Sequence, residues 1–190
     1  MNNASFITNL FKFSLLDPKE AAKEILEKDF PYEVIWSIFI ASICVTTAMQ
    51  FAVESFMKQD GPSLIDFSRP SVFACTIAGT TLFVCGTITW TGQRFGGQSK
   101  FKSIFALLAW LQVVQLVLQA LIYTVLALVP ILTAFAQIVI LFWSMWIFVA
   151  FMDTAHGFEN MFKTALVALL GISLAGVLLL FIVSLMSFGN

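Results

Sequence analysis

Four stretches of the chain contain no charged residue, and their lengths constrain the fold more than any other feature. They cover residues 34–53, 70–93, 103–152 and 164–190. A membrane-spanning helix needs about 20 apolar residues to cross a hydrocarbon core about 30 Å thick. The first, second and fourth stretches therefore predict one crossing each. The third stretch has 50 residues, which is too long for one span, so we expect it to turn near Pro130 and cross twice.

The composition supports the same fold class. Of the 190 residues, 59% are hydrophobic and only 11% are charged, whereas a soluble domain carries about 25% charged residues. The net charge of −1 gives no reason to expect a nucleic-acid partner. We predict an all-α, polytopic membrane protein whose residues 32–190 form a five-helix transmembrane domain. The predicted spans are 33–54, 71–92, 103–128, 131–152 and 163–187.

Residues 1–31 are predicted to form short amphipathic helices on the cytoplasmic side of the membrane. Apolar residues recur at mostly helical spacing over 6–13, a pattern typical of a helix lying in the membrane interface. A second helix should start at Asp17, because an aspartate N-cap, Pro18 at the first helical position and Glu20 three residues on form a capping box. This second helix either packs against the bundle or binds a partner.

The distribution of Lys and Arg predicts the orientation, because cytoplasmic segments are enriched in basic residues. With five spans, one side of the membrane receives eight basic residues and the other receives two, Lys58 and Arg69. We therefore predict a multi-pass protein with its N-terminus in the cytoplasm and its C-terminus on the opposite side. The eight residues are Lys12, Lys19, Lys23, Lys28, Arg94, Lys100, Lys102 and Lys163.

The loop QRFGGQSKFKSIF, residues 93–105, combines basic residues with a double glycine. Gly96 and Gly97 give the backbone the freedom that a tight turn between helices needs. Arg94, Lys100 and Lys102 are predicted to contact anionic lipid headgroups, worth about 1 kcal/mol each, or a partner protein. The loop is thus interpreted as a turn and an anchor.

The third predicted span carries a polar stripe formed by Gln112, Gln115, Gln119 and Tyr123. Spacings of three, four and four residues place these side chains on one face of a helix. Unpaired polar groups are costly in hydrocarbon, so the stripe should face other helices. It provides either hydrogen bonds between helices or the wall of a polar pathway. Possible partners on other spans are Gln50, Gln93 and Gln137.

The sequence DTAHGFE at 153–159 contains the only histidine of the chain. Asp153 and His156 would share a helix face, and Glu159 could complete a metal site, but these are weak candidates because Gly157 breaks the helix between them. Polar residues are also ordinary at a membrane edge. No phosphate-binding glycine loop is present. We therefore predict no catalytic residue, no cofactor and no assigned metal.

Three segments resemble the Yip1 family of small five-span membrane proteins, in particular its bacterial branch. They are Asp17-Pro18, the stretch RFGGQSKFKSIFALLAWLQ and the stretch DTAHGFENMFKTAL. The resemblance implies five spans, a cytoplasmic N-terminus and a place in the bacterial inner (cytoplasmic) membrane. Eukaryotic relatives are linked to Rab GTPases, vesicle traffic and membrane shaping. Their cytosolic DLYGP-type motif is absent here and the N-terminal segment is short, which argues against a GTPase partner.

Three functional hypotheses remain. The first is a non-enzymatic scaffold or membrane-organising protein that acts through helix–helix and lipid contacts, as a homo-oligomer or as a subunit of a larger complex; it predicts a buried and hydrogen-bonded glutamine stripe. The second is a small transporter or channel subunit that uses the same stripe as a pore wall. It is weakened because no span has a charged residue near its centre. The third is a membrane metalloenzyme.

Overall fold

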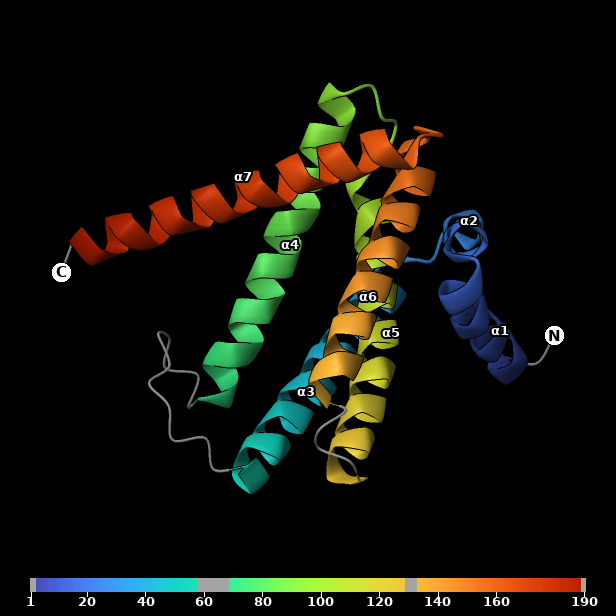
Figure 1. Ribbon diagram of the computed structural model, residues 1–190. Coiled ribbons are helices and arrows are strands. Elements are labelled where there is room, and N and C mark those ends of the chain that lie inside the picture. Colours follow the sequence, from blue (N-terminus) through green and yellow to red (C-terminus); the bar gives the residue numbers. More distant parts are fainter. Residues whose placement is uncertain (1–2, 58–68, 129–132, 189–190) are drawn as a thin grey trace.

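The computed structural model describes residues 3–57, 69–128 and 133–188, and all the regular structure in these ranges is helical (Figure 1). Two short helices precede five long ones. The short ones are α1 (Asn3–Leu16) and α2 (Pro18–Lys28). The long ones are α3 (Tyr32–Met57), α4 (Pro70–Arg94), α5 (Phe101–Leu128), α6 (Thr133–His156) and α7 (Met161–Phe188).

All five long helices are long and apolar enough to cross a membrane. The predicted all-α fold with five spans is therefore confirmed, and the chain is a multi-pass membrane protein. The qualifying segments are Tyr32–Val53, Pro70–Arg94, Phe101–Thr124, Phe135–His156 and Met161–Phe181. The turn predicted at Pro130 lies outside the described residues, between the end of α5 and the start of α6.

Helix α5 is the centre of the bundle, and α3, α4 and α6 all pack against it. Helix α7 runs obliquely across the end of α4 (Figure 1). The crossing is close at Gly171, where an added Cβ would lie 3.1 Å from the Cα of Ile88 and 2.9 Å from the Oγ1 of Thr91. A small residue is needed at this point because the two backbones nearly touch.

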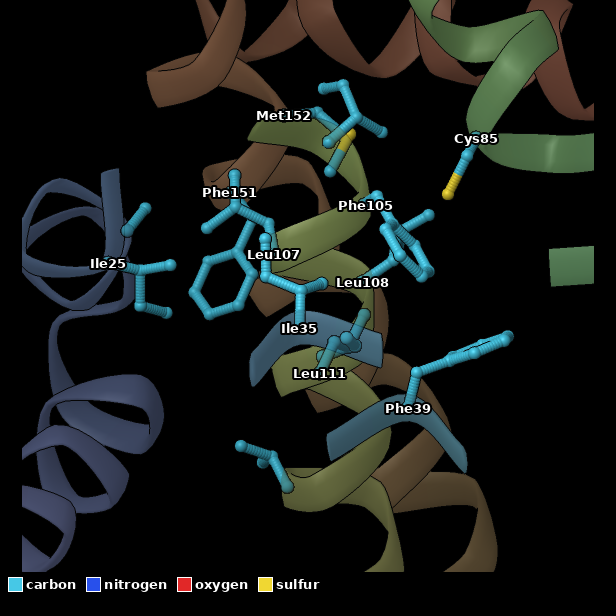
Figure 2. Packing of buried hydrophobic residues seen from close by; sticks show 14 of the residues in the cluster. Ile25, Ile35, Phe39, Cys85, Phe105, Leu107, Leu108, Leu111, Phe151 and Met152 are labelled. Carbon is cyan, nitrogen blue, oxygen red and sulfur yellow. The ribbon is translucent and has the colours of Figure 1, made fainter. Parts of the chain in front are cut away.

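An apolar cluster fills the half of the bundle where α3 and α5 begin and α6 ends. Phe39, Phe105 and Phe151 are each at most 1% exposed. The rings of Phe39 and Phe105 meet edge to face with their centroids 5.1 Å apart, a preferred geometry for aromatic pairs. Figure 2 shows Ile25 of α2 pointing at Phe151 and Leu107, so α2 closes the side of this cluster.

Helices α1 and α2 pack on each other and on the α5–α6 side of the bundle. The predicted start of α2 is confirmed, because Asp17 is its N-cap and accepts a hydrogen bond from the Glu20 amide at 3.4 Å. Ala21, Ala22 and Ile25 are buried against the bundle. Of the two interpretations of α2, packing against the bundle therefore accounts for its apolar side.

Candidate functional site

A polar cavity of about 480 Å³ lies in the opposite half of the bundle from the apolar cluster. Its walls come from the C-terminal half of α3, the glutamine-rich part of α5 and the N-terminal half of α6, with one residue from α4. All four residues of the predicted stripe line it. The polar lining residues are Thr46, Gln50, Gln112, Gln115, Gln119, Tyr123, Gln137 and Ser144.

Two hydrogen bonds tie the stripe to neighbouring helices. The Gln112 amide donates to Thr81 Oγ1 at 3.0 Å, and the Tyr123 hydroxyl donates to Gln50 Oε1 at 3.2 Å. The predicted partner Gln50 is therefore found. The predicted partner Gln93 is wrong, because its amide donates to the Ser99 carbonyl at 2.9 Å, in the turn that follows α4.

The stripe as a whole is not the buried, fully bonded seam that the scaffold hypothesis predicts. Gln112 Oε1 is buried and has no hydrogen-bond partner in the described structure. Gln115 and Gln137 are exposed. Helical spacing showed correctly that these residues share a face, but the facing helices leave a cavity over most of it instead of closing on it.

Asp153 lies at the opposite end of the bundle and is only 3% exposed. Its Oδ2 accepts from the Lys19 ammonium at 2.6 Å and its Oδ1 from the Thr164 hydroxyl at 2.6 Å. One carboxylate therefore joins α2, α6 and α7. Both of its oxygens are occupied, so its chemistry here is that of a clamp between helices, held by short hydrogen bonds to a charged acceptor.

His156 is 2% exposed and fills a space left by Gly92 of α4 and Gly97 of the turn that follows α4. Its Nδ1 lies 2.9 Å from the Met152 carbonyl. A carbonyl only accepts, so the hydrogen belongs on Nδ1. Nε2 is directed toward the Ile88 carbonyl without full hydrogen-bond geometry. A side chain at Gly92 would overlap the imidazole, and a Cβ at Gly97 would lie 2.6 Å from its Cδ2. His156 is thus a packing residue.

The weak metal candidates Asp153, His156 and Glu159 do not form a ligand set. Among the residues that the structure describes, no group of three His, Cys, Asp or Glu side chains could hold a metal ion. Glu159 is exposed, in the turn between α6 and α7 with φ +53°. The left-handed turn at Gly157 (φ +67°) ends α6 and separates Glu159 from the other two.

The three basic residues of the 93–105 loop differ in their surroundings. Arg94 is exposed, with its guanidinium 5.2 Å from the Trp90 ring. Lys100 is exposed as well. Lys102 instead forms an ion pair with Asp29 at 2.6 Å. Asp29 lies between α2 and α3, so this ion pair attaches their connection to the start of α5.

The whole length of the chain can be compared with known protein families. The model described as the Yip1 domain matches residues 12–185. The chain belongs to the Yip1 family. No curated protein and no solved structure matches.

The three segments that carry the Yip1 resemblance meet at one place in the fold. The Gln98 amide of the RFGG turn donates to the His156 carbonyl at 3.2 Å, and Lys19, which follows Asp17-Pro18, pairs with Asp153. We call this place the junction; it consists of Lys19, Gly92, Gly97, Asp153, His156 and Thr164. Sequence patterns pointed to Asp153 and His156, but no pattern indicated that Lys19, Gly92 or Thr164 would be their neighbours.

Proposed function

We propose that this Yip1-family protein is a non-enzymatic, membrane-organising protein that acts through lipid and helix–helix contacts. The observation that supports the proposal is the fixed position of the α1–α2 pair on the bundle. The junction attaches α2, while the Trp110 indole donates to Ser14 at 2.8 Å and the Trp143 indole donates to the Leu15 carbonyl at 3.2 Å. These contacts hold α1 rigidly beside α5 and α6.

Exposed apolar side chains at several points around α1 are suited to lipid. Ile7 is 55% exposed and Leu16 is 64% exposed, and Phe13 lies on the same short helix. An amphipathic helix buries its apolar side among acyl chains near the headgroups. Because α1 is fixed to the bundle, its apolar side chains occupy area in one leaflet only, which is a physical route to shaping the bilayer.

We infer that this leaflet is the cytoplasmic one of the bacterial inner membrane, with the C-terminus on the opposite side. The eight-to-two distribution of basic residues supports the orientation. Three segments assigned to the same side by that rule lie together at the junction, through Lys19, Gln98 and His156. Lipids are the proposed partners, together with further copies of the chain or other subunits. Nothing favours a GTPase or a nucleic acid.

Reconstitution tests the proposal. The full chain would be placed in vesicles of phosphatidylethanolamine and phosphatidylglycerol, and the vesicle diameter would be measured by cryo-electron microscopy. We expect smaller vesicles as protein content rises, and loss of this effect in the Ile7→Asn/Leu16→Asn variant. Lys23→Gln, at an exposed position of α2, is the control. Wild-type vesicles with the diameter of protein-free ones would refute the proposal.

A second candidate function is a small transporter or channel subunit, and the cavity over the glutamine stripe favours it. The apolar cluster at Phe39, Phe105 and Leu107 fills the other half of the bundle, so transport would require those helices to separate. Single cysteines at positions 112, 115, 119 and 123 would be tested with a membrane-impermeant thiol reagent. Labelling from both sides is expected of a transporter, and uniform protection would rule it out.

A further inference from the structure

The polar groups of the cavity have more hydrogen-bonding capacity than the protein itself uses. Gln112 Oε1 is buried without a partner. In the described part of the chain, the side-chain amides of Gln115, Gln119 and Gln137 make no hydrogen bond either, although all three line the cavity. Unpaired amides next to hydrocarbon are costly, so a ligand that pairs them gains affinity from them.

The residues that line the cavity disfavour a charged ligand. Among the residues that the structure describes, the fifteen that line the cavity include no Asp, Glu, Lys, Arg or His. An anionic or cationic headgroup placed there would leave its charge without a counter-charge in a medium of low polarity. An amide offers both a donor and an acceptor, and so does a hydroxyl group. The chemistry of the lining therefore matches an uncharged, hydroxylated ligand.

The location of the cavity indicates that this ligand has an apolar part. Helices α3 and α6 both pack on α5 and hardly touch each other in the described ranges, so the cavity lies between them. Apolar residues make up the rest of its lining, and one of them, Leu141, is 59% exposed on the lipid-facing surface. A ligand could thus place polar groups against the glutamines and extend acyl chains sideways into the bilayer.

We propose that this cavity binds the uncharged headgroup and glycerol-ester region of a neutral membrane lipid, with the acyl chains leaving between α3 and α6. A volume of about 480 Å³ lies within the range of small-ligand pockets, roughly 300–1,000 Å³. It is enough for a glycerol or a single sugar but not for the acyl chains. The binding site is separate from α1 and from the junction, so it goes beyond the membrane-organising function.

Native mass spectrometry of the full chain in detergent tests this site. The probes are dioleoylglycerol and monoglucosyl dioleoylglycerol as neutral lipids, dioleoylphosphatidylglycerol as the anionic one, and free glucose. We expect the retention that depends on the cavity glutamines to be at least about tenfold greater for a neutral lipid than for the anionic lipid or glucose, the effect of one hydrogen bond of ~1.4 kcal/mol. The Gln115→Leu/Gln119→Leu variant should retain neutral lipid roughly tenfold less, and Gln98→Leu, outside the cavity, should behave as wild type.

A second variant keeps the test valid if the glutamine variant is poorly folded. Ile140→Phe fills part of the cavity with apolar volume, so it should displace the lipid while the melting temperature in lipid-free detergent stays the same or rises. The proposal would be overturned if the cavity variants lowered retention of anionic and neutral lipid equally, if retention were unchanged in both variants, or if no lipid were retained. Glucose binding as tightly as the glycolipid, or a second copy of the chain in place of lipid, would overturn it as well.

Discussion

The junction and the cavity are two polar regions among the packed helices, and they differ in how their polar groups are paired. At the junction, both oxygens of Asp153 accept hydrogen bonds and the His156 ring is enclosed. In the cavity, Gln112 pairs one end of its amide and leaves the other unpaired. Paired groups such as the Asp153 carboxylate are what a structural contact requires, and His156 Nε2 is an exception at the junction. Several unpaired amides around one cavity are characteristic of a binding site.

The largest expected effect is at the junction. Gly92→Ala would force a methyl group into the buried His156 ring, and we expect it to lower the free energy of unfolding by about 3 kcal/mol. Gly79→Ala is the control, because no atom lies within 4 Å of its added Cβ; it should be neutral or stabilise the helix by ~0.5 kcal/mol. Reversible unfolding in mixed detergent micelles measures both.

The cause of that loss can be isolated by adding His156→Ala to the Gly92→Ala variant. If the ring and the methyl group are the conflicting atoms, the double variant should be more stable than the sum of the single changes predicts, by more than ~1 kcal/mol. Simple additivity would mean that Gly92 matters for another reason, such as backbone geometry, and that His156 does not lock the turn.

Asp153→Asn should have the next largest effect, at about 2 kcal/mol, because it weakens a charge-assisted hydrogen bond at a buried carboxylate. The loss is limited because the Lys19 side chain is 41% exposed and water screens the pair. Lys23→Gln removes an ion pair with Glu20 that is exposed on both sides, and it should cost less than ~0.5 kcal/mol. Equal losses in the two variants would show that Asp153 is not a clamp.

These residues show what the sequence could and could not predict. The charge-free stretches predict five spans because a bilayer fixes the length of a helix, and the capping residues predict the start of α2 because capping is local. The pairing of Lys19 with Asp153 joins residues 134 positions apart, and no local pattern encodes it. The same holds for Gly92, which looks like any other glycine of a span until His156 is placed beside it.

The cavity illustrates a different limit. Spacing shows that Gln112, Gln115 and Gln119 share a helix face, but it says nothing about the distance to the next helix. Whether the face becomes a bonded seam or a cavity wall depends on how α3 and α6 pack on α5. Both alternatives therefore remained open at the level of sequence, and the structure separates them residue by residue.

A smaller effect should distinguish the residues of the stripe. Gln112→Leu removes the hydrogen bond to Thr81, and we expect it to lower the free energy of unfolding by up to ~1 kcal/mol. The loss is limited because the substitution also removes the unpaired Oε1. Gln115→Leu removes an exposed amide without a bond, so stability should change by less than ~0.5 kcal/mol. Thr81→Val should match Gln112→Leu, and combining them should add little. A clear loss in Gln115→Leu would restore the seam interpretation.

The smallest effect concerns the basic loop beside the junction. Lys102 pairs with Asp29, whose side chain is 78% exposed, so Lys102→Gln should cost only ~0.5 kcal/mol and this cost should disappear in high salt. Retention of anionic lipid by the purified chain should depend more on the other two basic residues of the loop than on Lys102. Arg94→Gln and Lys100→Gln should each weaken headgroup binding by about 1 kcal/mol, and Lys102→Gln by less, because its ammonium is already paired. If all three lose the same affinity, Lys102 also serves as a headgroup ligand, and the Asp29 pair must open when lipid binds.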